Sequence, residues 1–259
     1  MSAALSVSTL GAGGASSVAG PIPFARLVRV EWAKATDTRV ARWLLALVAL
    51  STAGIMALPV LVPKSFDQTQ FGYLGVASVG LSILLPVVAI LMFTGEWSQR
   101  SVMTTFTQEP RRLRVVQAKL MVSLLLSAGG ALFGGVVAAA GIGVAGASGR
   151  VLEANLSAGA IASYVVYVLL NVLAAVALGV LLQNSAAAIA ASFALPAALA
   201  LVGTASTLVS EWVDMATTWN WILENQWSGH VLQIAVSIMF WVVAPLAAGV
   251  VRTVRRDVG

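Results

Sequence analysis

The sequence has 259 residues, no cysteine, a single histidine (His230), and only 10% charged residues. The missing cysteines exclude disulfides, thiol chemistry and thiolate metal sites. One histidine excludes a metal site built from several histidines. Soluble domains carry about 25% charged residues, so this charge content, with 59% hydrophobic residues, indicates a chain surrounded by lipid.

Ionisable residues are also missing from the middle of every long apolar run. Ion-coupled transporters usually place acids or histidines there, so their absence argues against proton coupling, while sodium sites made of backbone oxygens stay open. The sequence has no GxxxxGK[ST] loop for a nucleoside triphosphate and no paired acids or metal ligands for intramembrane hydrolysis. The chain is not expected to be an enzyme, and energy for uphill transport must come from a partner.

The first twenty residues are small and uncharged, without the basic and compact apolar regions of a secretory signal. We interpret residues 1–20 as a disordered cytoplasmic tail and residues 21–259 as a single transmembrane domain. Six apolar runs in that domain have the length of about 20 residues that a membrane helix needs. The expected spans are 43–61, 72–94, 120–147, 158–182, 186–209 and 231–251. Because the runs do not alternate in polarity, they predict an all-α membrane protein.

Basic residues predict the orientation of the spans. Thirteen lie in the N-terminal segment, the loop between spans two and three, and the C-terminus, whereas Lys64 and Arg150 alone lie on the opposite side. Basic residues stay in the cytoplasm, so both termini and the central loop are expected inside, in a bacterial inner membrane. They form no separate basic domain, which argues against nucleic acid as a partner. The short link Gln183-Asn184-Ser185 predicts a tight antiparallel hairpin.

Residues 21–36 are predicted to form an amphipathic helix on the cytoplasmic interface, started by Pro21 and Pro23. Its apolar side faces the membrane lipids, and its basic side faces their headgroups. Two roles of this helix remain open: it anchors the chain on the membrane, or it packs on a partner subunit and transmits the motion of that subunit. The apolar positions are Phe24, Leu27, Val28 and Trp32, and the basic positions are Arg26, Arg29 and Lys34.

Small residues and prolines interrupt several spans. Gly130-x3-Gly134 and Gly129-x5-Gly135 in the third span are candidate packing faces, within the chain rather than between chains. Prolines inside spans favour kinks, with a functional hinge as the alternative. Polar residues inside spans are candidates either for lining a pathway or for helix-packing hydrogen bonds. The prolines are Pro86, Pro196 and Pro245, and the polar residues are Ser82, Asn171, Ser192 and Thr204.

The longest polar segment, Gly95 to Leu120, holds five of the fifteen basic residues and separates two membrane-length runs. An acid at the end of a span opposes the helix dipole, so we expect Glu96 instead to cap a short helix from about Trp97 to Thr107. That helix is expected to end before Pro110. Lys119 is expected to snorkel at the mouth of the third span.

Two parts of the chain resemble the type-two permeases of ATP-binding cassette transporters. The first is the central loop, with Glu96, a small residue at Ser101, Thr104-Thr105, Pro110, Arg112 and Lys119. The second is the segment RVEWAKATDTRVARW, Arg29 to Trp43, which leads into the first span. The number of spans and their topology agree as well. The chain departs from the pattern at Ser101-Val102, where many relatives have Gly-Thr, which puts a role of that pair in doubt.

The resemblance implies an export permease for a hydrophobic or amphipathic compound. Its partners are a cytoplasmic ATPase subunit, which binds ATP and magnesium, and a second permease, either another copy or a homologue. The resemblance places the coupling helix on Trp97 to Phe106, with Glu96 and Arg112 as polar contacts of the ATPase. The residues expected to take part in coupling are Glu96, Trp97, Arg100, Ser101, Thr104, Thr105, Phe106, Pro110 and Arg112.

The family also implies short re-entrant helices between spans five and six, which Glu211 to Trp227 fits. The tryptophans of this segment favour an outer aromatic belt, with an outer gate as the sharper alternative. They are Trp212, Trp219, Trp221 and Trp227. Two rival functions remain: a non-transporting membrane subunit that docks a cytoplasmic partner, and an autonomous facilitator.

Overall fold

The computed structural model describes residues 22–98 and 111–255, and 85% of these residues are helical. Six helices are long and apolar enough to cross a membrane, which confirms the six expected spans and makes the chain a multi-pass membrane protein. The spans are α2 (Arg39–Leu61), α3 (Gln70–Ser98), α5 (Arg112–Ala147), α6 (Ala158–Leu182), α7 (Ser185–Gly203) and a sixth made of α10 (Val231–Ile238), η2 (Met239–Val243) and α11 (Ala244–Arg255).

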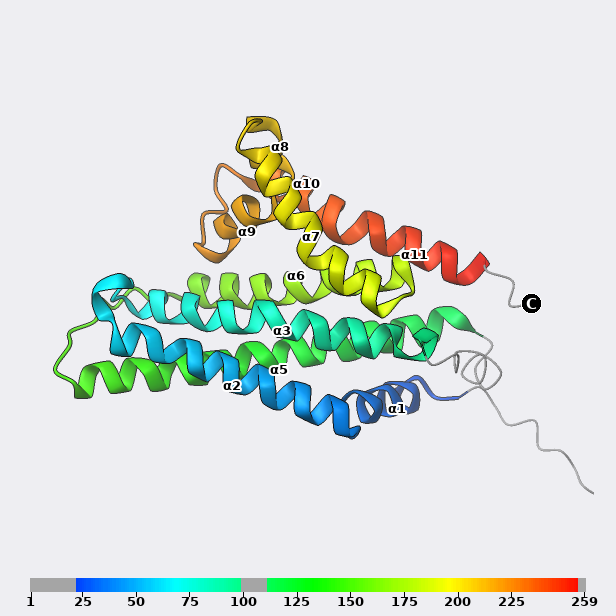
Figure 1. The fold of residues 1–259 in the computed structure, drawn as a ribbon, viewed down its shortest axis with the longest axis horizontal. Helices are drawn as coiled ribbons and strands as arrows, with labels where there is room; N and C mark the ends of the chain where they lie inside the picture. Colours follow the sequence, from blue (N-terminus) through cyan, green and yellow to red (C-terminus); the bar gives the residue numbers. More distant parts are fainter. Residues whose placement is uncertain (1–21, 99–110, 256–259) are drawn as a thin grey trace, which may run out of the picture.

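The spans run between two ends of the bundle that differ in composition (Figure 1). Helix α1 (Phe24–Thr36), the last turn of α3, the first turns of α5 and the end of α11 gather at one of them, which we call the basic end. The other end holds the short helices η1 (Pro63–Ser65), α8 (Thr207–Trp212) and α9 (Met215–Leu223), and we call it the tryptophan-rich end. The N-terminal helix and the last helix of the chain therefore lie at the same end.

Three boundaries differ from the expected ones. Helix α5 begins at Arg112, well before residue 120, and the helix of the fifth span ends at Gly203 instead of residue 209. Helix α3 continues through Gly95 to Ser98, so Glu96 lies in its last turn and does not cap a helix that begins at Trp97. The Glu96 carboxylate is bound by Lys34 and Lys119.

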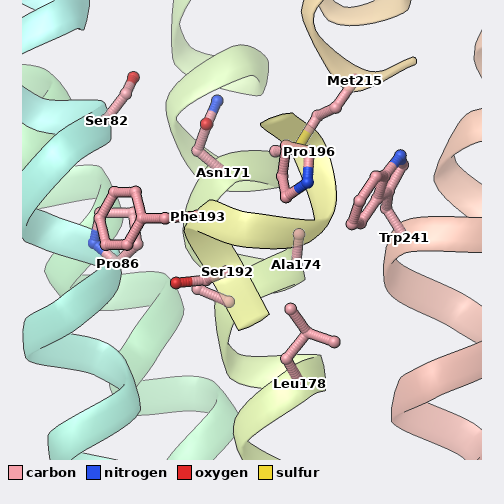
Figure 2. Close-up of a pocket in the computed structure, with 11 residues that line it drawn as sticks. Ser82, Pro86, Asn171, Ala174, Leu178, Ser192, Phe193, Pro196, Met215 and Trp241 are labelled. Atoms are coloured by element: carbon pink, nitrogen blue, oxygen red, sulfur yellow. The ribbon is translucent and has the colours of Figure 1, made fainter. Parts of the chain in front are cut away.

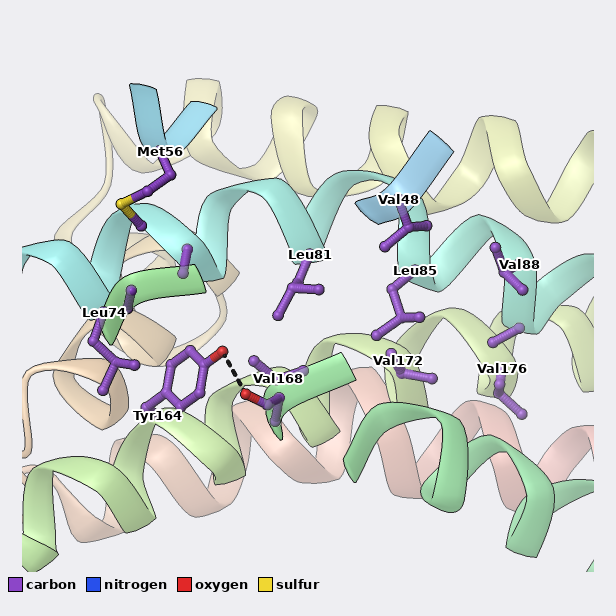
Figure 3. Packing of buried hydrophobic residues seen from close by; sticks show 14 of the residues in the cluster. Val48, Met56, Leu74, Leu81, Leu85, Val88, Tyr164, Val168, Val172 and Val176 are labelled. Carbon is purple, nitrogen blue, oxygen red and sulfur yellow. Dashed lines mark hydrogen bonds between the residues drawn. The ribbon is translucent and has the colours of Figure 1, made fainter. Parts of the chain in front are cut away.

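Helix α3 is the centre of the bundle, because α2, α5 and α6 all pack on it. Figure 3 shows the apolar side chains that fill this core. Leu81 and Leu85 of α3 face Val168 and Val172 of α6, and all four are nearly inaccessible. Tyr164 of α6 also crosses the core and donates its hydroxyl to the Ala131 carbonyl of α5, 3.1 Å away.

The small residues of α5 divide into a packed face and an open face. A Cβ atom at Gly130 would come within 2.6 Å of Leu85, and one at Gly134 would meet Tyr164 and Leu81. Nothing lies within 4 Å of the position that a Cβ would take at Gly129, Gly135 or Gly143. Packing of Gly130-x3-Gly134 inside the chain is thus confirmed, whereas the Gly129–Gly135 face packs on nothing in the described part of the chain.

The link between α6 and α7 is the expected tight hairpin. Gln183 adopts a left-handed conformation with φ of 53° and ends α6, and the Asn184 side chain accepts the Ala187 N–H at 3.0 Å to begin α7. Helix α7 packs on α6, α3, α8 and α9, but only 6% of the residues in its apolar window are fully buried. One side of the fifth span is therefore left for lipid or another chain.

Replacing Gly134 with leucine is expected to destabilise the fold by about 1–3 kcal/mol, because the side chain would collide with Tyr164 and Leu81. Replacing the adjacent Gly135 with leucine is the matched control, since its Cβ position is open. Thermal unfolding of the purified chain in detergent would compare the two. Equal losses of stability would contradict the close packing of α5 on α3 and α6.

Candidate functional site

Four charged side chains form a closed ring of alternating sign at the basic end. Glu31 of α1 binds Lys34 of α1 at 2.8 Å and Lys119 of α5 at 2.7 Å. Glu96 of α3 binds the same two lysines, Lys34 at 2.6 Å and Lys119 at 3.4 Å. Each carboxylate thus meets two ammonium groups, and each ammonium group meets two carboxylates. We call Glu31, Lys34, Glu96 and Lys119 the charge ring.

Three of the four members of the charge ring are almost completely buried. The side chains of Glu31 and Lys119 are each 5% exposed and that of Glu96 is 14% exposed, whereas Lys34 is 42% exposed. Removing charges from water is costly, and their mutual attraction offsets that cost only when every charge keeps its partners. The closed arrangement meets this condition, so the loss of one member leaves the others uncompensated.

The charge ring corrects the sequence interpretation of Lys119. Its ammonium group does not snorkel into water but points into the protein, between Glu31 and Glu96 and 5.9 Å from the centre of the Phe93 ring. Burial between two carboxylates removes the need to reach the membrane surface. Lys119 therefore joins α5 to α1 and α3.

Lys34 is the exposed member of the charge ring. Burial by itself lowers the pKa of Lys34, but the hydrogen bonds and the attraction of Glu31 and Glu96 outweigh burial and raise its pKa above 10.5. Lys34 is therefore fully charged at neutral pH, and the charge ring is complete there.

Four further contacts tie helices together at the basic end. Arg114 of α5 donates to the Ile22 carbonyl ahead of α1 at 2.7 Å. Arg112 of α5 donates to the Thr253 carbonyl of α11 at 3.1 Å, and the Thr253 hydroxyl accepts from Gln183 at 3.0 Å. Thr94 of α3 and Ser185 of α7 share a hydrogen bond of 2.7 Å. The two helices that flank residues 99–110 are thus linked to α1, α7 and α11.

The expected coupling residues are only partly described. Glu96 and Arg112 both turn toward their own chain, Glu96 in the charge ring and Arg112 against α11. Trp97 lies in the last turn of α3. Whether any of these residues touches an ATPase stays a prediction. The remaining members lie outside the described residues: Arg100, Ser101, Thr104, Thr105, Phe106 and Pro110.

Helix α1 docks on the bundle through a face that its apolar pattern does not predict. Glu31 and Ala35 are its buried residues, and with the half-buried Val28 they face α5. Phe24 and Trp32 are more than a third exposed, which leaves them for lipid. Leu27 is half-buried, and Arg26 and Arg29 are exposed. Contact of this helix with lipid headgroups stays a prediction.

Glu31 is the functional candidate that the sequence interpretation missed. Its signal is its place in the helix, four residues after Leu27 and four before Ala35, on a face that is otherwise apolar. An acid on such a face needs a buried cation. The sequence has several lysines and arginines that could bind Glu31, and the fold shows that Lys119 is its buried partner.

A cavity of about 390 Å³ opens beside the charge ring. Lys34, Glu96 and Lys119 line its polar side, together with Thr38 at the start of α2 and Ser185 at the start of α7. Its other walls are apolar, from Leu44 of α2 and three residues of α3. The α3 residues are Val88, Leu91 and Met92. A molecule with an apolar body and a polar group matches this lining.

The tryptophans at the opposite end have different surroundings. Trp219 is 1% exposed and donates its indole N–H to Ser237 at 3.1 Å, so it belongs to a core between α9, α6 and α10 and not to a lipid-facing belt. Trp227 is half-buried and donates to Ser163 at 2.7 Å, and Trp221 stacks on His230. Trp212 is half-buried at the end of α8. Of the two short helices here, α9 lies inside the expected segment Glu211 to Trp227, whereas α8 begins earlier, at Thr207.

Among residues 22–98 and 111–255, no three acids or histidines come together as a metal site. No model of a known protein family matches the chain, and no curated protein matches it.

Replacing Lys119 with methionine is expected to cost about 3–5 kcal/mol of stability, because Glu31 loses its buried partner. Adding Glu31→Gln should recover much of the loss, since the second change removes the unpaired charge. Chemical unfolding in detergent measures both, with the exposed Lys64→Met as the control. Additive losses in the double variant would count against a coupled pair.

The contribution of Lys34 to stability is expected to depend on pH only at alkaline values. Its pKa is raised on folding, so the contribution is complete below 10.5 and is lost as the pH rises through the folded-state pKa. The difference in melting temperature between the natural chain and Lys34→Met should be constant from neutral pH to 10.5 and shrink above it. A difference that vanishes near neutral pH would argue against the ring geometry.

Proposed function

We propose that the chain is the membrane-spanning permease subunit of an ATP-driven exporter of the ATP-binding cassette class. The resemblance of the central loop and of residues 29–43 to type-two permeases is the starting point of this proposal. ATP is hydrolysed on a separate cytoplasmic subunit, and the basic end faces that subunit. This orientation follows the excess of basic residues at that end.

The charge ring is the observation that carries the proposal. It joins α1, the end of α3 and the start of α5, and α3 and α5 flank residues 99–110 on both sides. An ATPase that pushes on that segment moves three helices as one body, because buried ion pairs resist separation. Motion passes from there to the core, where α2 and α6 pack on α3.

Work is transmitted only if the ATPase binds the two states of the permease with different strength. The rigid linkage at the basic end makes such a difference in binding possible. Because the linked helices move together, the ATPase binds a surface whose position changes with the conformation of the whole bundle. Arg112 and Thr94 extend the linkage to α11 and α7. In this proposal Glu96 connects α3 to α1 and α5 through its ion pairs with Lys34 and Lys119.

Two surfaces support the remaining parts of the proposal. The cavity beside the charge ring combines apolar walls with polar groups, which suits a hydrophobic or amphipathic compound. The exposed side of α7, which includes Phe193, Leu195 and Leu201, leaves an apolar face for a second permease, and the translocation pathway lies between the two. The second permease is another copy or a homologue.

Charge reversal at Glu96 is expected to disconnect the ATPase from the spans. The chain has no cysteine, so spin labels can be placed at Leu61→Cys in α2 and Leu201→Cys in α7, both well exposed. We expect trapping of the ATPase with ATP and vanadate to change the distance between the labels in the natural background and to leave it unchanged with Glu96→Lys.

Inverting the whole charge ring provides the matched rescue. The variant Glu31→Lys, Lys34→Glu, Glu96→Lys, Lys119→Glu keeps four alternating charges and should restore the distance change. Glu153→Lys, an exposed reversal at the tryptophan-rich end, is the control. A chain that captures no ATP-hydrolysing subunit when purified from its native membrane would overturn the proposal and favour a docking subunit or a facilitator.

A further inference from the structure

A second, smaller cavity of about 40 Å³ lies among α3, α6, α7 and the sixth span (Figure 2). Two prolines that interrupt apolar spans, Pro86 of α3 and Pro196 of α7, both line it. So do Ser82 and Ser192, each four residues before one of these prolines. Figure 2 shows both pairs around the same space.

Each proline leaves a backbone oxygen without its usual partner. Proline has no N–H, so the carbonyl four residues earlier cannot accept the normal helical hydrogen bond. These carbonyls belong to Ser82 and Ser192. Residues four apart share one side of a helix, and here both members of each pair line the cavity. The interrupted hydrogen bond of α3 and that of α7 therefore face the same space.

The sixth span contributes a third irregularity. Pro245 removes the normal partner of the Trp241 carbonyl, and Trp241 lines the cavity as well. The helix widens at this point, in the π-helical turn η2, where the Ala244 N–H bonds to the Met239 carbonyl five residues back. Such turns occur frequently at functional sites.

Most hydrogen-bond donors around the cavity are already in use. The hydroxyls of Ser82 and Ser192 donate to the carbonyls of Ser78 and Ile189 in their own helices, at 2.7 and 2.8 Å. The Asn171 amide donates one hydrogen to Tyr167, and the Trp241 indole donates to Val213. Among the side chains that line the cavity, the unused hydrogen-bonding capacity is chiefly that of acceptors: the hydroxyl lone pairs of Ser82 and Ser192 and the Asn171 amide oxygen. The carbonyls that lack a proline N–H belong to residues of the same lining.

These bonds also bear on the two interpretations of the polar span residues. Ser82, Asn171, Ser192 and Thr204 all bond to their own helix, so none of these bonds joins two helices. The first three line the cavity and Thr204 does not.

We propose that this cavity binds the hydroxyl group of an uncharged amphiphile. The volume suits one small polar group, since a water molecule needs at least about 10–15 Å³. Among the described residues, none that lines the cavity is ionisable, which disfavours a charged group in this low-dielectric setting. Phe193 of α7 lines the cavity and is also 47% exposed, so an apolar chain attached to the bound group can lie along α7. The inference deepens the proposed export function by naming its substrate class.

The binding test uses the purified permease in detergent without any ATPase. The probes are 4-bromoundecan-1-ol, whose bromine lies a few carbons from the hydroxyl and quenches nearby indoles, and its methyl ether, which has no hydroxyl donor. Quenching that disappears with Trp241→Phe reports binding at the cavity. The alcohol should saturate this signal at a concentration roughly tenfold lower than the ether, as one or two hydrogen bonds provide.

Restoring two of the helical hydrogen bonds should reduce the preference. The double variant Pro86→Ala, Pro196→Ala supplies the N–H groups missing in α3 and α7, so the alcohol should lose a large part of its advantage over the ether. Pro59→Ala is the matched control, because Pro59 lies inside α2 and away from the cavity. Unchanged melting of each variant confirms that it is folded.

Three outcomes would overturn the inference: equal binding of alcohol and ether by the natural chain, a preference that is undiminished in the double variant, or tighter binding of the bromoalkyl ammonium analogue than of the alcohol. None of them bears on the spin-label experiment, which needs the ATPase and no ligand. If the spin-label experiment failed, binding of the alcohol at the cavity would still stand, and only its connection to export would be lost.

Discussion

Two carboxylates and two ammonium groups meet at the basic end, and the arrangement of the helices there depends on them. Helix α1 has few apolar contacts with the bundle, chiefly those of Ala35 with Val122 and Leu126. Its position is fixed instead by Glu31, which reaches Lys119, and by Lys34, which reaches Glu96. In a hydrocarbon setting a charge is tolerated only beside its partner, so the charge ring determines where α1 lies.

The middle of the bundle is held mainly by close packing. Lipid provides no hydrophobic force between helices, so small residues such as Gly130 and Gly134 must let the backbones approach. Helix α3 benefits most, because α2, α5 and α6 surround it. The two kinds of interaction lie in different places. Close packing of side chains stabilises the middle of the bundle, and ion pairs stabilise the basic end, which is proposed to receive force from the ATPase.

Features that depend on nearby residues could be predicted from the sequence, and features that depend on distant ones could not. Six spans and the hairpin at Asn184 follow from local hydropathy and loop length, and the structure has them. The end of α3 and the start of α5 were misplaced, because helices extend beyond the apolar run when polar contacts hold them, as at Glu96. The end of α7 was misplaced in the opposite direction, since this helix ends at Gly203, within the apolar run.

The charge ring could not be predicted from sequence patterns, because it joins residues that are far apart in the chain. Glu96 and Lys119 stood out as polar residues near span ends, but nothing local paired them with Glu31. The shared cavity of Pro86 and Pro196 was hidden for the same reason. Each proline predicted an interruption of its own helix, and only the packing of α3 beside α7 brings the two together.

The charge ring has an electrical consequence. Its two lysines and two glutamates sum to zero, so moving them together through the field of an energised membrane does no net electrical work. A single unpaired charge would experience about 2.3 kcal/mol for every 100 mV that it crossed. The charge ring therefore adds no voltage dependence of its own to a joint displacement of α1, α3 and α5. Any such dependence comes from the other charges on these helices, which are Arg26, Arg29, Arg112 and Arg114.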